Sequence, residues 1–321
     1  MRAIQITEPG RFRIVDTPEP AAGPGEVLIA VQACVTCPHW DTTLFRGVDI
    51  FERPGHPRYP IPVGYPGHEV SGRVEAVGEG VTSLRVGDRV ATLKAGGESN
   101  PGFYSELIAR PADMVVRIPD NTSYEAAASM EMAFHMSPYV HALGDVAGKR
   151  VGVVGLGPAG IIALQMVRAQ GAGAVVAIDL VPERLELART LGADQVVRIE
   201  PDTAPAELER DPLEASIDCT GAAAGMQVAL DHTVGGPVSP FGVIHGEAIY
   251  TTRHWRNRTG IASRVAPEAP DASYVTGLWA AEKLNTEVLI GARLPFERYD
   301  EGVQLLLAKQ ALKVCYLPQG A

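Results

Sequence analysis

Short apolar runs separated by glycine and proline dominate the first part of the chain. Runs of this length between turn residues are typical of β-strands, because strands bury alternate side chains and turns need residues with unusual backbone angles. The pattern predicts strands at Ala3–Ile6, Arg11–Val15, Glu26–Ala33, Gly72–Val77, Asp88–Ala91, Glu106–Ala109 and Met114–Arg117. We therefore expect a compact, mostly β domain in this part.

From Ser123 onward the pattern changes to longer helical segments that alternate with short apolar runs. Ser123 is a suitable N-cap for a helix, and a second helix is expected from Glu131 to about Gly144. Further strands are predicted at 151–154, 174–178, 195–199, 215–219 and 236–242, and helices at 161–170, 182–191 and 222–230. Such alternation favours a parallel sheet with helices on both faces.

Three other segments complete the pattern. Ala204–Arg210 is expected to be an acidic surface segment, and Thr251–Asp271 a solvated connection that holds a strand at Gly260–Val265. In the tail, helices are predicted at 273–284 and 299–308, with strands at 288–294 and 314–317. We expect this tail to return to the first domain.

One stretch combines a strand, a tight turn, a helix and a second strand. Gly155, Gly157 and Gly160 follow the apolar run Val151–Val154 with the spacing G-x-G-x-x-G. The first glycine permits the turn, the second lets backbone approach a pyrophosphate, and the third lets helix and strand pack closely. The unpaired N–H groups at the start of the helix, around Pro158 and Ala159, favour bound phosphate. The stretch predicts a dinucleotide site.

An acidic residue ends the second strand of this unit. Asp179 lies about twenty residues after the glycines, where a carboxylate accepts hydrogen bonds from the adenosine ribose hydroxyls. The same carboxylate repels a 2′-phosphate, so we interpret the site as one for NAD, with NADP less favoured. Arg184 is the nearby cation that argues in the other direction.

Composition and charge exclude several classes of partner. Of the 321 residues, 46% are hydrophobic and 21% charged, and the formal net charge is −10. An acidic chain without a basic run is not expected to bind nucleic acid or an anionic membrane surface. No run of eighteen apolar residues predicts a membrane span, and the first residues resemble a strand more than a signal sequence. The four cysteines suggest a reducing, cytoplasmic location without a disulfide framework.

Two Gly- and Pro-rich stretches of the β domain place metal-ligating residue types beside carboxylates. They are Ala33–Asp41 (ACVTCPHWD) and Tyr65–Gly72 (YPGHEVSG), and we expect both to be loops. Cysteine, histidine and carboxylate side chains bind zinc and carry protons. Cys34 and Cys37 have no second cysteine pair, so a four-cysteine site is rejected. A site here has to form in three dimensions.

The order of these features resembles the medium-chain dehydrogenase/reductase superfamily, in its zinc-dependent alcohol and polyol dehydrogenase branch. The resemblance covers almost the whole chain. It depends on Pro24–Val27, Pro66-Gly-His-Glu-x-x-Gly72, Val77-Gly78, Val86–Val90, Gly102–Glu106, Ile118–Asp120, Gly155–Gly160, Leu191–Asp194 and Leu294–Phe296. It implies an α/β protein with a GroES-like catalytic domain (1–122 and 279–321) and a Rossmann coenzyme domain (123–278). Homodimers or homotetramers are implied by analogy.

The resemblance also implies one catalytic zinc and a set of residues around it. Cys37 and His68 match the ligand cysteine and the histidine of the Gly-His-Glu motif, and Glu69 is the adjoining carboxylate. Glu131 occupies the place where polyol dehydrogenases have a glutamate at the metal, directly or through water. Whether Glu69 or Glu131 is the third ligand stays open. The implied reaction is hydride transfer between NAD(H) and a secondary alcohol or ketone of unidentified structure.

Two of the departures from the family pattern bear on the metal sites. The family continues its ligand cysteine with one residue, a Ser or Thr and an Asp, whereas Cys37 is followed by Pro38, His39, Trp40 and Asp41. His39 takes the place of the proton-passing hydroxyl, so it is either the proton carrier, a fourth ligand or a packed side chain without chemistry. Between Val90 and Gly102 there is no cysteine, which predicts a short loop without a structural zinc.

Two other functions are compatible with the same fold. A metal-free enoyl or quinone reductase normally lacks the ligand cysteine and the glutamate of Gly-His-Glu and prefers NADPH, so Cys37, Glu69 and Asp179 count against it. A non-catalytic dinucleotide-binding protein is the third hypothesis, because the Ser/Thr-Asp pair is missing.

Overall fold

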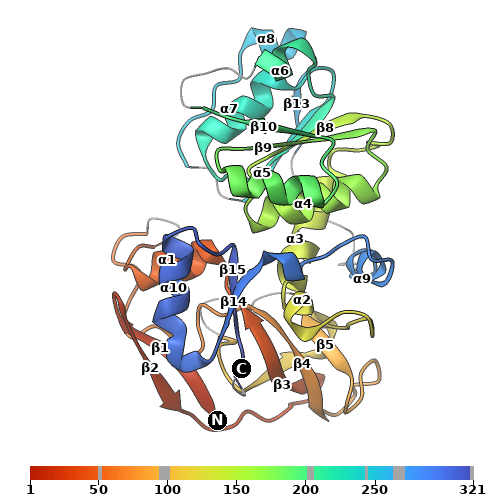
Figure 1. Cartoon of the computed structure of the whole chain (residues 1–321). Helices are drawn as coiled ribbons and strands as arrows, with labels where there is room; N and C mark the ends of the chain where they lie inside the picture. The colour runs from red at the N-terminus through yellow and green to blue at the C-terminus, as the bar shows by residue number, and fades with distance from the viewer. Residues whose placement is uncertain (50–52, 94–101, 201–205, 243–244, 263–271, 319–321) are drawn as a thin grey trace. The chain divides into compact units, whose positions relative to one another are not determined.

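The computed structural model describes residues 1–49, 53–93, 102–200, 206–242, 245–262 and 272–318. These residues form two compact units, Met1–Met132 with Thr286–Ala321, and Ala133–Asn285 (Figure 1). The chain therefore leaves the first unit and returns to it near its end. The domain boundaries expected from the sequence stay a prediction, and each unit is described by itself.

The first unit is built on a seven-stranded sheet and a separate antiparallel pair. The pair consists of β1 (Arg2–Glu8) and β2 (Arg11–Asp16). The sheet has the order β14-β15-β3-β4-β5-β7, and β6 also pairs with β3. Its strands are β3 (Glu26–Val35), β4 (Glu69–Val77), β5 (Arg89–Thr92), β6 (Leu107–Pro111), β7 (Val115–Arg117), β14 (Ile290–Leu294) and β15 (Lys313–Tyr316). The expected return of the tail is confirmed, because β15 pairs with β3.

Short helices complete the first unit. They are α1 (Pro38–Phe45), α2 (Tyr124–Ala128) and α10 (Tyr299–Leu307), with 3₁₀ turns η1 (Ala112–Met114), η2 (Glu287–Leu289) and η3 (Phe296–Arg298). α3 (Met130–His141) begins in this unit and continues into the second. Side chains of β3 alternate between buried and half-buried positions, and the apolar ones form the core with β1, β4 and α10.

The second unit is a six-stranded parallel sheet in the order β10-β9-β8-β11-β12-β13. The strands are β8 (Arg150–Val154), β9 (Ala174–Asp179), β10 (Gln195–Arg198), β11 (Ala215–Asp218), β12 (Pro237–Pro240) and β13 (Gly260–Ile261). The helices are α4 (Pro158–Ala169), α5 (Pro182–Thr190), α6 (Ala206–Arg210), α7 (Ala223–His232), α8 (Thr252–Arg256) and α9 (Ser273–Ala280). Figure 1 shows α4 and α5 on one face of the sheet and α7 on the other, as the sequence predicts. No described helix has the length and apolar character that a membrane crossing requires.

Two predictions of local structure were wrong. The stretch Ala33–Asp41 ends in helix α1 and not in a loop. Pro38 lies in the first turn of this helix, where proline is favoured. Strand β4 begins at Glu69, three residues earlier than expected, because Glu69 pairs with Val35 across the sheet. The segment predicted to be acidic, whose secondary structure the sequence left open, contains helix α6.

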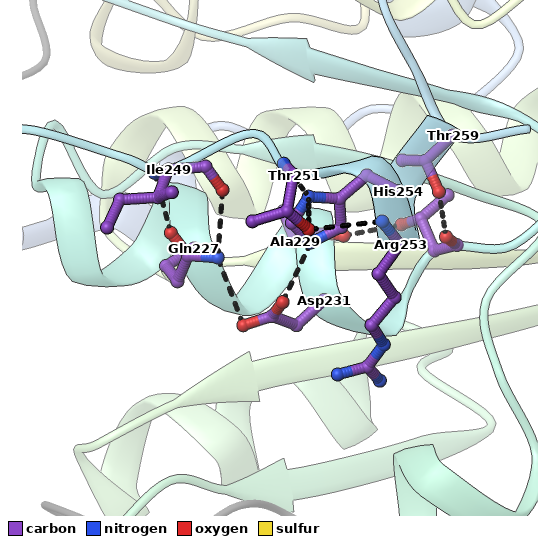
Figure 2. A network of polar contacts seen from close by, with 9 residues as sticks. Gln227, Ala229, Asp231, Ile249, Thr251, Arg253, His254 and Thr259 are labelled. Carbon is purple, nitrogen blue, oxygen red and sulfur yellow. Dashed lines mark hydrogen bonds and ion pairs between the residues drawn. The ribbon is translucent and has the colours of Figure 1, made fainter. Parts of the chain in front are cut away.

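The stretch predicted as a solvated connection after residue 250 also contacts α7, as Figure 2 shows. His254 is buried, its Nε2 lies 2.8 Å from Asp231 Oδ1, and its Nδ1 accepts the Thr251 N–H at 2.9 Å. Gln227 binds both backbone groups of Ile249. Most described residues of the stretch are exposed, as predicted, and β13 confirms the start of the expected strand. The prediction did not foresee helix α8 or the buried His254. The end of the predicted strand, beyond 262, lies outside the described residues.

We predict that His254→Ala lowers the free energy of unfolding by about 1–3 kcal/mol, because the Thr251 N–H loses its acceptor and Asp231 keeps only its bond from Gln227. Denaturant unfolding followed by circular dichroism measures this change. Trp255→Ala is the matched control on the same helix. Its side chain is 72% exposed, so we expect a change within about 0.5 kcal/mol. Equal losses in the two variants would contradict the proposed role of the network.

Candidate metal and cofactor sites

Cys37 lies where the chain passes from β3 into α1. It is the N-cap residue of α1 and is half-buried, so its thiol is accessible without being fully solvated. The N–H of Cys37 donates to Asp41 Oδ2 at 3.0 Å, and the N–H of Asp41 donates back to the Cys37 carbonyl at 2.9 Å. The backbone of Cys37 is thus fixed from both sides by the first turn of the helix.

His68 sits immediately before β4, at the end of a tight segment. Its Nδ1 lies 2.8 Å from the carbonyl oxygen of Pro66, which can only accept, so Nδ1 carries the proton. A neutral imidazole in this tautomer presents the lone pair of Nε2, the arrangement in which histidine binds metals. The preceding residue has to be glycine, since a Cβ on Gly67 would lie 2.6 Å from the Tyr104 nitrogen.

Three potential ligand atoms converge in the first unit. One donor atom each from Cys37, His68 and Glu69 lie within 4.8 Å of one another, and His68 and Glu69 are buried. A thiolate, an imidazole nitrogen and a carboxylate are donors that fit Zn²⁺. The register that pairs Val35 with Glu69 brings these segments together, because it places the ends of β3 and β4 side by side.

The electrostatics of His68 reflect its anionic neighbours. Burial alone lowers the pKa of His68, but the Cys37 side chain, Glu131 and Glu69 outweigh this and raise it to about 10. A cation is therefore strongly favoured at this position. The same anionic surroundings would favour a divalent metal bound to these side chains in their deprotonated forms.

Glu69 has a partner that the sequence analysis missed. Lys313 of β15 donates to Oε1 and Oε2 of Glu69, each at 2.6 Å, and to the carbonyl of Thr36 at 2.9 Å. Both side chains are fully buried. Burial raises the pKa of Glu69 above its ordinary value, and the Lys313 ammonium opposes that rise. A lysine within the apolar strand Lys313–Tyr316 is the signal that could have revealed the pair.

The other two residues expected at the metal lie on helices. Glu131, in the first turn of α3, is half-buried and close enough to raise the pKa values of both His68 and Glu69. His39 is in the first turn of α1 and is exposed. Its neighbour Trp40 packs edge-on against the His68 ring, with 5.8 Å between centroids. The roles expected of Glu131 and His39 stay predictions.

The glycine turn of the second unit joins β8 to α4 as the motif predicts. Gly155 has a φ of +85°, and a Cβ on Gly160 would lie 1.8 Å from the Gly155 carbonyl oxygen, so both positions require glycine. Gly157 is the N-cap of α4, and nothing lies within 4 Å of the position of its missing Cβ. Pro158 has no N–H, so in the first turn the N–H groups of Ala159 and Gly160 remain for a ligand.

Asp179 ends β9 beside this turn. Its Oδ2 accepts the Leu156 N–H at 2.6 Å and its Oδ1 accepts the Val181 N–H at 2.8 Å. The carboxylate thus holds the glycine turn and keeps further lone pairs for a ligand. Arg184 of α5 lies beside it, with 3.9 Å between NH1 and Oδ2.

Comparison with known proteins assigns the chain to a family. Residues 23–120 match the model of the alcohol dehydrogenase GroES-like domain, and residues 158–267 match that of the zinc-binding dehydrogenases. The (R,R)-butanediol dehydrogenase of Bacillus subtilis is 30% identical over 73% of this chain and 74% of that enzyme. The chain belongs to the zinc-type alcohol dehydrogenases of the medium-chain dehydrogenase/reductase superfamily.

Other members of this zinc-type alcohol dehydrogenase family extend the similarity. Human sorbitol dehydrogenase is 28% identical over 97% of this chain and 94% of its own length. An alcohol dehydrogenase of Geobacillus stearothermophilus is 37% identical, over 60% of this chain and 62% of that enzyme. The crystal structure of Bacillus subtilis 2R,3R-butanediol dehydrogenase has a TM-score of 0.84, 25% identity and 99% coverage of both chains. The GroES-like and Rossmann folds expected from the sequence are confirmed. The predicted absence of a structural zinc falls in 94–101, outside the described residues.

We predict that Lys313→Met lowers the free energy of unfolding by about 3–5 kcal/mol, because Glu69 is then buried without its partner. Urea unfolding at mildly alkaline pH, where the carboxyl favours its charged form, measures the loss. The double variant Glu69→Gln/Lys313→Met removes both charges, so we expect it to recover most of the stability. A double variant that is no more stable than Lys313→Met would show that the ion pair is not the cause.

Proposed function

We propose that this protein is a zinc-dependent oxidoreductase that transfers hydride between NAD(H) and a small secondary alcohol or ketone. The observation that carries the proposal is the convergence of Cys37, His68 and Glu69 within 4.8 Å, in the unit that matches the GroES-like dehydrogenase domain. The glycine turn of the second unit supports a dinucleotide. The relatives named for sorbitol and butanediol support a small alcohol or polyol as substrate.

For the metal ligands we propose Cys37, His68 and Glu131, with Glu69 next to the metal but not on it. Both oxygens of Glu69 are held by Lys313 at 2.6 Å, so a metal would compete with a buried ammonium for them. Glu131 is half-buried and close enough to raise the pKa of His68. Three protein ligands leave the open position that catalytic zinc sites keep for substrate or water.

Zinc held by these residues would polarise a carbonyl oxygen or acidify an alcohol, and a bound nicotinamide would supply the hydride chemistry. The residues of the chain supply the setting. The Pro66 carbonyl keeps the Nδ1 of His68 protonated and its ring in one orientation. The apolar edge of Trp40 shields the imidazole from water. His39, exposed beside it on α1, is proposed to exchange the substrate proton with solvent.

For the cofactor we propose NAD. Asp179 is a buried carboxylate that two backbone N–H groups fix in place. Its negative charge therefore acts on any ligand group bound at the end of β9. A 2′-phosphate would be repelled there, whereas ribose hydroxyls can donate to the carboxylate. Arg184 lies 3.9 Å from that carboxylate and partly offsets it.

Two further expectations complete the proposal. All four cysteines are free thiols, which supports the reducing cytoplasm expected from the sequence. Homodimers or homotetramers stay a prediction from the family. The metal-free reductase is not favoured, because the ligand cysteine and the glutamate that such relatives lack both lie in the cluster.

We predict that the purified protein contains about one zinc per chain and that Cys37→Ser and His68→Ala lose it. Metal analysis by mass spectrometry measures this, with alcohol oxidation assayed on the same samples. Cys219→Ser is the matched control, because Cys219 is also half-buried but lies outside the cluster. Full activity in zinc-free wild-type protein would refute the proposed function.

We predict that kcat/KM with NAD exceeds that with NADP by about tenfold or more, a ratio that about 1.4 kcal/mol of repulsion produces. Asp179→Asn should lower this ratio, because the amide removes the charge while its oxygen can still accept the Leu156 N–H. Steady-state kinetics with both cofactors test this. An unchanged ratio in the variant would exclude Asp179 as the discriminating residue.

A further inference from the structure

A carboxylate that the proposed reaction does not use contacts the backbone of Cys37, one of the three residues in the candidate metal cluster. Asp41, on α1, is fully buried and accepts three hydrogen bonds. Oδ2 accepts the Cys37 N–H at 3.0 Å, while Oδ1 accepts the hydroxyls of Tyr104 at 2.7 Å and Tyr299 at 2.9 Å. A buried carboxylate needs donors of this kind, so the arrangement is a closed polar cluster within the apolar core.

The three donors come from segments far apart in sequence. Cys37 is four residues from Asp41, whereas Tyr104 is 63 and Tyr299 is 258 residues away. Tyr104 and Tyr299 are fully buried and their rings meet edge-on, with 5.5 Å between centroids. Asp41 therefore cannot shift without breaking contacts to two other parts of the unit.

Tyr104 also contacts the segment that carries His68. Its N–H donates to the Gly64 carbonyl at 3.0 Å, and the neighbouring Phe103 N–H donates to the Gly67 carbonyl at 2.9 Å. A side chain on Gly67 would collide with the ring of Tyr104. One tyrosine thus touches the chain just before His68 through its backbone and reaches the Cys37 segment through its hydroxyl.

We propose that Asp41, held by Tyr104 and Tyr299, is a positioning residue that sets the distance between Cys37 and His68. It acts through the Cys37 backbone, since the imidazole of His68 is oriented by the Pro66 carbonyl instead. The proposal deepens the zinc site and in that respect rests on the proposed function. The local contacts themselves exist without metal, so the two claims can be separated by experiment.

The matched control is a third tyrosine in the same cluster. Tyr316 is fully buried, and its ring lies 5.5 Å from that of Tyr104 and 5.4 Å from that of Tyr299. Its hydroxyl donates to the Tyr299 carbonyl at 2.8 Å and not to Asp41. Replacing any of the three tyrosines by phenylalanine removes one buried hydroxyl, but only two of the changes take a bond from Asp41.

The first test measures zinc affinity by competition with a chromophoric chelator. Tyr104→Phe, Tyr299→Phe and Asp41→Asn should weaken zinc binding by about tenfold or more, the effect typical of residues that orient metal ligands. Tyr316→Phe should change the zinc affinity by no more than about twofold, which is well below that effect. Equal weakening by all three tyrosine variants would overturn the proposal in favour of a general packing role.

The second test needs no metal. Hydrogen exchange of the peptide that contains Cys37, in metal-free protein, should be faster in Tyr104→Phe and Asp41→Asn than in wild type or Tyr316→Phe. Unchanged exchange would refute the positioning role even if zinc is bound. Faster exchange in Tyr104→Phe and Asp41→Asn, together with a wild-type protein that binds no zinc, would support the positioning of Cys37 and reject only the proposed function.

Discussion

A glutamate and a lysine, 244 residues apart and both fully buried, form the interaction on which the first unit depends. Taking two opposite charges out of water is unfavourable unless they meet with good geometry and further hydrogen bonds. The geometry is met here by two contacts of 2.6 Å and a third bond from Lys313 to Thr36. The pair thereby fixes β15 against the ends of β3 and β4, where the candidate ligands emerge.

The pair also decides how much negative charge the cluster presents. Cys37, Glu69 and Glu131 are three groups that favour a cation, and each acts on His68. Lys313 offsets the charge of one of them, Glu69, and both side chains of this pair are fully buried. Glu69 is thus the carboxylate that holds the sheet, whereas Glu131 is the one that we propose as a metal ligand.

Features encoded within a few residues could be predicted from the sequence, whereas features that depend on distant contacts could not. The glycine turn and Asp179 follow from one short stretch, in which each glycine answers a local steric demand. Cys37 and His68 were identified from their residue types and the family motif. Lys313 and Tyr299 were missed because their partners lie hundreds of residues away and no local pattern marks them. Helix α1 was missed because Pro38 resembled a loop residue, although proline is also common in the first turn of a helix.

The return of the chain to its first unit has a consequence for biosynthesis. A ribosome completes β3, β4 and the whole parallel sheet before it reaches residue 313, so Glu69 is made long before its counter-ion exists. Until then this carboxylate has to be either solvated or neutralised by a proton. The strand that carries it cannot yet be buried in its final surroundings. The cluster of Cys37, His68 and Glu69 can therefore reach its final form only after the last strand arrives, when every strand of the parallel sheet has already been synthesised.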